Sequence, residues 1–142
     1  MSSLANVLRL LLTDMQADLR SYAQLHGLLD EQLAAIAQQR SEELQRIATQ
    51  VTALVDELDG RRRQRRELVA TMLGRKHGLS MDEALERLPI KAAAVLREAW
   101  QTLEQAVQLA KQLNARNCEL MIEQRSLMQR LLGNEQDTYA EL

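Results

Sequence analysis

Several residue types are missing or rare in this chain of 142 residues. It contains no phenylalanine, two tyrosines, one tryptophan, one proline and one cysteine. Because Cys118 is alone, no intrachain disulfide can form, and a reducing compartment is expected. The 18 basic and 20 acidic residues leave a net charge of −2, which argues against a dedicated nucleic-acid-binding protein.

Membrane and secretion signals are also lacking. No apolar run approaches the roughly 20 residues that a membrane-spanning helix needs, and the first residues lack the basic flank and small-residue cleavage site of a secretory signal. A cytoplasmic protein is therefore expected. Leucine, alanine, glutamine, glutamate and arginine dominate instead, as in helical bundles and coiled coils.

A seven-residue apolar repeat runs through most of the chain. In the first third it comprises Leu8, Met15, Tyr22, Leu29 and Ile36. In the last third it comprises Ala92, Ala99, Ala106, Leu113, Leu120 and Leu127. In the middle it begins with Leu44, Val51 and Leu58, is interrupted by arginines, and resumes at Leu68. A sustained heptad repeat predicts long helices packed side by side.

Helix-capping and helix-breaking residues predict the ends of these helices. Ser41 ahead of Glu42 and Glu43 favours a turn near residue 40, with the serine as cap. One continuous helix through this point is the alternative, because the segment contains neither Gly nor Pro. Ser80 and Glu83 form a capping box, and Pro89 separates the short helix that follows from the last long one.

The expected fold is all-α, an elongated antiparallel helical bundle or coiled coil of three long helices plus one short helix. The long helices should cover about 4–38, 42–73 and 90–132, and the short one about 80–87. Gly74 and Gly78 predict the end of the second long helix, and Gly133 the end of the last. Residues 1–132 then form a single helical domain, and residues 133–142 a flexible acidic tail.

The arginine run at residues 61–66 interrupts the apolar stripe, since Arg61, Arg62 and Arg65 take positions filled elsewhere by apolar residues. The first helix has a matching defect at Asp14 and Asp18. If the chain reverses between residues 39 and 40, Arg61 faces Asp18 and Arg65 faces Asp14. We therefore expect a polar layer that fixes the register of the two helices. Solvated arginines and a phosphate-binding patch are the alternatives.

The last third of the chain has a broader apolar face than one packed seam needs. Leucine and methionine dominate it, and flexible methionine surfaces suit adaptable recognition of an amphipathic helix. Packing within the bundle core is the alternative. His26, His77 and Cys118 are too far apart in sequence to indicate a metal site. No catalytic motif is present, so neither an enzyme nor a cofactor is expected.

Four sequence elements together resemble a known family. They are a Leu-rich first helix with Tyr22-Ala-Gln-Leu25 and the segment Leu28–Ala34, the Ser41-Glu-Glu-Leu44 start of the second helix, Asn114-Ala-Arg-Asn117 followed by leucines, and Thr138-Tyr139. Across nearly the whole chain they resemble the FlgN family, flagellar export chaperones of hook-filament junction proteins.

The resemblance implies a cytoplasmic chaperone that binds the helical tails of secreted hook-associated proteins. It would keep these clients soluble and deliver them to the flagellar type III export gate. The client contacts that it nominates are Leu113, Asn117, Leu120, Met121, Leu127, Met128, Leu131 and Leu132. Tyr139 is a further candidate for contact with the client or the gate. A chaperone of a virulence-type secretion needle subunit and a coiled-coil structural adaptor are the alternatives, and a homodimer is left open.

Overall fold

Helices account for nearly all of the structure. The computed structural model describes the backbone of residues 2–74 and 80–140 and the side chains of residues 4–72, 74 and 80–133. The four helices are α1 (Ser2–Ala37), α2 (Ser41–Leu73), α3 (Met81–Glu86) and α4 (Ile90–Ala140). Within these described ranges there is no strand. The expected all-α fold of three long helices and one short helix is confirmed.

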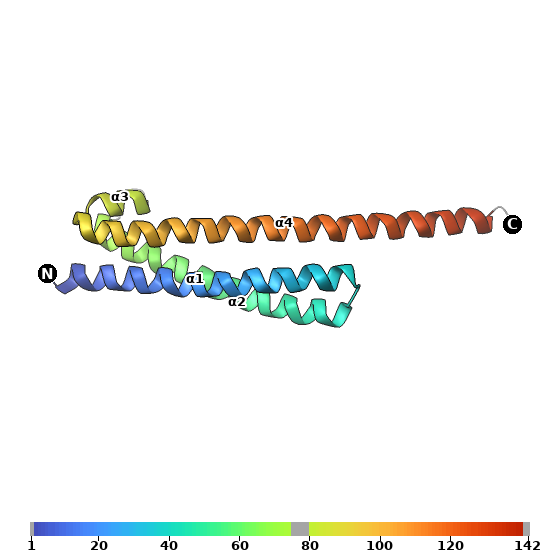
Figure 1. The fold of residues 1–142 in the computed structure, drawn as a ribbon, viewed down its shortest axis with the longest axis horizontal. Helices are drawn as coiled ribbons and strands as arrows, with labels where there is room; N and C mark the ends of the chain where they lie inside the picture. Colours follow the sequence, from blue (N-terminus) through green and yellow to red (C-terminus); the bar gives the residue numbers. More distant parts are fainter. Residues whose placement is uncertain (1, 75–79, 141–142) are drawn as a thin grey trace.

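α1 is the helix on which the other two long helices pack (Figure 1). α2 runs back along α1 in the opposite direction, and α4 runs parallel to α1 on another side. α3 contacts both α2 and α4 at the end of the molecule where α4 begins. The arrangement is elongated because α4 continues well beyond the turn between α1 and α2 (Figure 1).

The turn between α1 and α2 confirms the predicted reversal near residue 40. Gln39 adopts a left-handed conformation with φ of 56°. The N–H of Arg40 donates to the carbonyl of Ala35 at 3.0 Å, and that of Gln39 to the carbonyl of Ile36 at 3.1 Å. This is a Schellman motif, which usually has glycine at the left-handed position. A glutamine there explains why the turn has no glycine signal in the sequence.

The capping predictions have mixed outcomes. Ser41 is the first residue of α2 and not its cap, since the capping residue is Arg40 and no side chain accepts a capping hydrogen bond. The prediction of a serine cap there is wrong. Ser80 does cap α3, because its Oγ accepts a hydrogen bond from the N–H of Glu83 at 3.4 Å. Gly74 ends α2 with φ of 82°, and Gly78 lies outside the described residues.

The predicted end of α4 is wrong. The helix continues through Gly133 and Asn134 to Ala140, so that it has 51 residues in place of the 43 predicted by the range 90–132. A single glycine inside a helix costs only about 1 kcal/mol relative to alanine, which is too little to stop a long helix by itself. The flexibility of residues 133–142 stays a prediction.

The buried apolar side chains form two clusters along the bundle. The first joins α1, the end of α2, α3 and the start of α4, and contains Leu11, Met15, Leu85, Leu96 and Leu103. The second lies nearer the α1–α2 turn and contains Leu25, Leu29, Leu54, Leu58 and Ala110. On α1 the buried residue Asp18 lies between the two clusters. The predicted polar interruption of the stripe therefore coincides with a real division of the core.

Replacement of Gly60 by alanine should stabilise the protein by about 0.5–1 kcal/mol, because glycine in a helix interior loses more chain entropy on folding than alanine does. Gly60 lies inside α2, and a Cβ atom there would meet nothing within 4 Å. Urea unfolding measures the gain. Gly74→Ala is the control and should instead lower the free energy of unfolding, because the φ of 82° at Gly74 disfavours a side chain. A loss of stability in Gly60→Ala would contradict the packing described for α2.

Candidate partner-binding surface

A buried charged layer joins α1 to α2. The carboxylate of Asp18 accepts hydrogen bonds from Arg61 Nε at 2.6 Å and from Arg65 Nη1 at 2.9 Å. Arg65 Nη1 also donates to Asp14 Oδ2 at 2.6 Å. A further hydrogen bond runs from Arg61 Nη2 to the hydroxyl of Ser21. The structure thus brings together all four predicted residues in the expected pairs, with Asp18 shared between both arginines.

The charged groups of this layer all have hydrogen-bond partners, although their burial costs desolvation free energy. The side chain of Asp18 is 3% exposed and that of Arg65 is 11% exposed. No buried side-chain nitrogen or oxygen atom in the described part of the chain lacks a hydrogen-bond partner. Burial raises the pKa of Asp14 above its ordinary value of 3.8, although hydrogen bonding to Arg65 lowers it. Desolvation therefore outweighs the ion pair at this carboxyl group.

The raised pKa of Asp14 predicts the direction in which the stability of the protein changes with pH. Between the unfolded-state and folded-state pKa values the native protein binds more protons, so the stability contributed by Asp14 falls as the pH rises through this window. Asp14→Asn removes this titration and keeps an oxygen that can accept from Arg65. Below about pH 4 the variant should match the wild type in urea unfolding. Toward pH 7 it should gain stability relative to the wild type, whereas a deficit that grows toward pH 7 would contradict this assignment.

The rest of the arginine run points away from this layer. Arg62 and Arg63 donate to the carboxylate of Asp59 at 2.8 Å and 2.7 Å, on an exposed part of α2. The placement of Arg62 on the buried stripe is therefore wrong, since its side chain is 58% exposed and lies at the edge of the hollow between α2 and α4. The guanidinium carbon of Arg65 lies 5.5 Å from the ring centre of Trp100, so this arginine also reaches α4.

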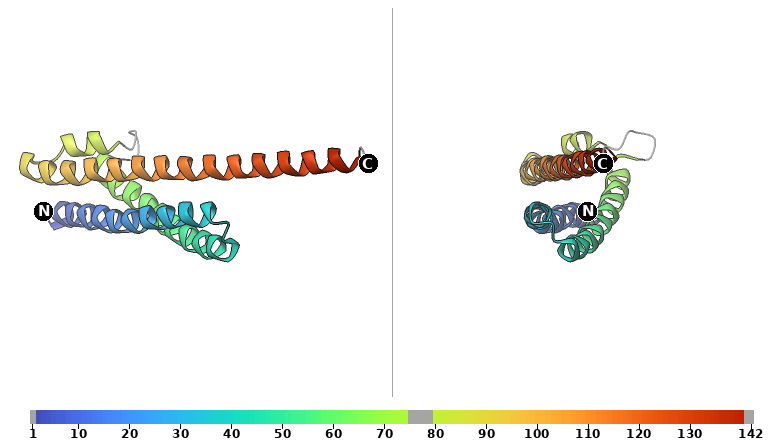
Figure 2. Two further views of the ribbon diagram at one scale, coloured as in Figure 1. Left: turned by 45° about the vertical axis from the view of Figure 1, so that its right-hand side comes forward. Right: turned by 90° about the vertical axis from the view of Figure 1, so that its right-hand side faces the viewer.

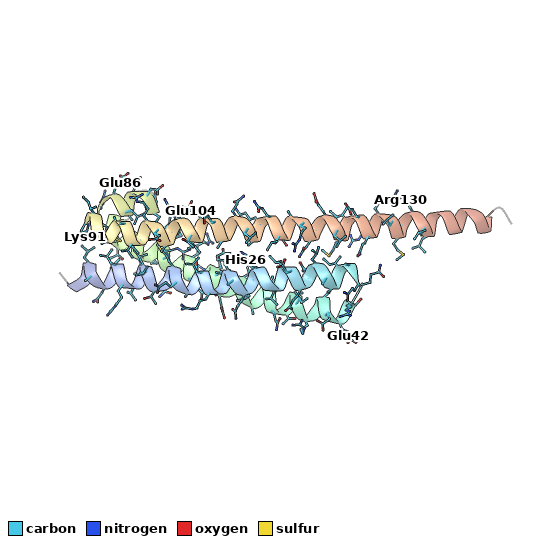
Figure 3. All side chains as sticks on the ribbon, in the orientation of Figure 1. His26, Glu42, Glu86, Lys91, Glu104 and Arg130 are labelled. Carbon is cyan, nitrogen blue, oxygen red and sulfur yellow. The ribbon has the colours of Figure 1, made fainter. Side chains whose placement is uncertain are left out.

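Polar contacts hold the middle of α4 on α1, and they include two clasps, at His26 and at Asn117, beside the ion pair of Arg116 with Asp30. Nε2 of His26 lies 2.9 Å from the carbonyl oxygen of Ala106, on the side of α1 that faces α4 (Figure 3). The amide nitrogen of Asn117 donates to the carbonyl of Leu29 at 2.7 Å and to Gln32 Oε1 at 2.8 Å. Asn117 is 1% exposed, and Leu113 packs against the second core cluster. Of the nominated client contacts, these two are thus occupied within the bundle.

Beyond these clasps α4 passes the end of α1 and the start of α2, and it then continues past them (Figure 1). We refer to residues 121–140 as the α4 extension; it runs past the α1–α2 turn and carries the labelled residue Arg130 (Figure 3). Leu127 is 54% exposed and Leu131 59% exposed, and the other nominated apolar residues of the extension, Met121, Met128 and Leu132, are similarly exposed. Leu120, just before it, is half-buried. A contiguous apolar surface of this kind indicates an interaction site.

One residue of this surface is absent from the sequence-based set. Ile122 is 67% exposed and lies beside Met121 on the extension. It lies outside the seven-residue stripe, so heptad reasoning could not find it, although a search for apolar residues on every face would have. The backbone of Tyr139 belongs to α4, but its side chain lies outside the described residues.

Searches for other kinds of site give no candidate. Among the residues that the structure describes, no three His, Cys, Asp or Glu side chains are grouped so as to hold a metal ion. None of the described helices combines the length and the apolar character that crossing a bilayer requires.

Comparison with known proteins identifies the family. Residues 7–136 match the family model described as FlgN protein. No curated protein and no solved structure matches the chain. The match covers most of the chain, including the charged layer, both clasps and the described side chains of the α4 extension. The chain therefore belongs to the FlgN family, a family of flagellar export chaperones.

Proposed function

We propose that this protein is a cytoplasmic chaperone of hook-filament junction proteins, and that the α4 extension binds their helical tails. The observation that carries the proposal is the row of half-exposed leucine and methionine side chains on the part of α4 that continues past the α1–α2 turn. The apolar side chains of such a surface are removed from water only when another helix covers them. The client would do so until it is delivered to the type III export gate.

The mechanism requires binding and release without chemistry. An affinity on the order of 1 µM, or about 8 kcal/mol, would hold a client and still allow hand-over. The six described apolar residues of the extension supply the contact area, and α1 and α2 keep the rest of α4 in place. Their geometry also suits a needle-subunit chaperone or a structural adaptor, but the family match favours a flagellar client.

Co-expression with junction-protein tails tests this proposal. The full chain should co-purify with such a tail, and a chain that ends at Ile122 should bind it at least about 100-fold more weakly. Truncation near Ala110 is a poorer test, because it also removes Leu113 and Asn117 from the bundle. Unchanged binding by the chain ending at Ile122 would refute the proposed site.

Salt provides an independent control on the class of partner. Binding to an apolar helix should change little between 0.1 M and 0.5 M salt, whereas binding to nucleic acid weakens steeply. Arg61 and Arg65 are engaged in the buried layer, and Arg62 and Arg63 are paired with Asp59. This pairing favours the protein partner over the phosphate-binding alternative.

A further inference from the structure

A groove runs along the bundle between α2 and α4. Both helices pack on α1, yet in the described residues no Cα atom of α2 lies within 8 Å of one of α4. The two helices are nearest at the α3 end and diverge toward the α1–α2 turn (Figure 2). One side of α1 therefore forms the floor of a groove whose walls are α2 and α4.

The groove is closed at its narrow end and carries apolar side chains on its floor and on both walls. Arg65 of α2 lies over Trp100 of α4 at the closed end. Next along the groove come Leu25 on the floor, Val55 on the α2 wall and Val107 on the α4 wall. Val55 is 48% exposed, which is unusual for a valine beside the core of a bundle.

At its wide end the groove joins the α4 extension. Ile36 at the end of α1 and Leu44 at the start of α2 line the same hollow as Met121 and Met128. The last two residues belong to the extension. A path from Val107 to the surface proposed to bind the client therefore has apolar side chains at both of its ends.

The charges along this path are unbalanced. Asp18 and Asp59, the acidic residues beside Val55 and Leu25, are both paired with arginines. Lys111 and Arg125 line the groove and have no acidic partner among the described side chains. Glu104 lies at the closed end, next to Trp100. Among the described side chains, the open part of the groove therefore presents apolar groups flanked by two cations, Lys111 and Arg125, that have no acidic partner.

We propose that the α2–α4 groove takes the amphipathic helix of the client as a fourth helix of the bundle, with acidic side chains of that helix against Lys111 and Arg125. The client helix would begin on the α4 extension and continue into the groove as far as Trp100. The inference rests on the proposed function only in taking the client as the source of the helix. What it adds is where the client helix binds, that this helix lies along α4, and that its flanks are acidic.

The test uses the full chain and two synthetic helical peptides alongside a junction-protein tail. The peptides share one leucine stripe and carry either glutamate or lysine on its flanks. Wild-type protein should prefer the glutamate peptide, and Lys111→Glu with Arg125→Glu should weaken its binding about ten-fold and favour the lysine peptide. Val55→Asp should weaken both the peptide and the tail by at least about ten-fold.

Matched variants keep the result interpretable. Val95→Asp alters a valine of similar exposure, and Lys91→Glu reverses a lysine, at sites that do not line the groove. Both should bind like the wild type. Val55→Ala serves as a milder variant if Val55→Asp melts below the wild type. If truncation at Ile122 abolishes binding while the Val55 and Lys111 variants bind normally, the groove is excluded and the proposed function stands. If the groove variants lose peptide binding but the tail never binds, the groove is retained and the proposed client is excluded.

Discussion

Replacement of Asp18 by alanine should lower the free energy of unfolding by about 3–5 kcal/mol, which is the largest stability effect expected for a single change in this protein. The reason is that Asp18 is the acceptor shared by Arg61 and Arg65. Among the described side chains, its removal leaves Asp14 as the acidic partner of Arg65 and the Ser21 hydroxyl as the hydrogen-bond partner of Arg61, in a part of the bundle that water scarcely reaches. Urea unfolding followed by circular dichroism measures the loss.

Asp59→Ala is the matched control for this experiment. Asp59 also accepts from two arginines, but it does so on the exposed side of α2, where such pairs contribute about 0–1 kcal/mol. Equal losses for Asp18→Ala and Asp59→Ala would contradict the account of the buried layer. The comparison separates burial from the number of ion pairs, since that number is the same at both sites.

A charge reversal tests whether the layer fixes the register of α1 against α2. In Asp18→Arg with Arg61→Asp, the new pair should recover part of what each single reversal loses. Recovery is incomplete because the arginine at position 18 would also face Arg65. Strictly additive losses would show that Asp18 and Arg61 are not coupled, and the proposed register role would then fail.

The largest effect on binding is expected from two aspartates on the α4 extension. Leu127→Asp combined with Leu131→Asp should weaken the complex with a junction-protein tail by at least about 100-fold, or about 3 kcal/mol, because both charges would be buried against the client. The melting temperature should stay close to that of the wild type, since both side chains are more than half exposed. Titration calorimetry and thermal melts give the two readouts.

Val95→Asp is the control for this pair, because Val95 is 54% exposed, as Leu127 is, but lies outside the extension. It should bind the tail as the wild type does. Wild-type affinity in the doubly substituted protein would remove the extension from the binding site. A large fall in melting temperature would instead show that Leu127 and Leu131 pack within the bundle.

Much of the fold could be predicted from the sequence because heptad spacing constrains helix packing directly. The position of one turn predicts that Asp14 faces Arg65 and that Asp18 faces Arg61. This is because facing residues on two antiparallel helices have residue numbers that add up to a constant. The turn itself was harder to place, because Gln39 takes a conformation that glycine normally marks. Its location was predicted from Ser41 as a cap and from the two glutamates that follow it, and only the acidic first turn of α2 is confirmed.

The candidate site could be predicted only in part. Sequence periodicity cannot tell whether a stripe faces its own bundle or an absent partner, and Asn117 illustrates the difficulty. This asparagine lies one helical turn before Leu120 on α4, yet it is buried against the carbonyl of Leu29. The boundary between core and free surface depends on where α1 ends relative to α4. That relation depends on three-dimensional packing and does not change the heptad pattern of the sequence.

Hydrogen exchange of the backbone amides, with and without a bound junction-protein tail, tests the central claim most directly. In the free protein the amides of residues 122–132 should exchange faster than those of the bundle, because this part of α4 lies at and beyond the α1–α2 turn and its described apolar side chains are about half exposed or more. Addition of the tail should slow their exchange by at least about ten-fold. If the tail binds and protects other segments while residues 122–132 exchange as before, the α4 extension is not the client-binding surface.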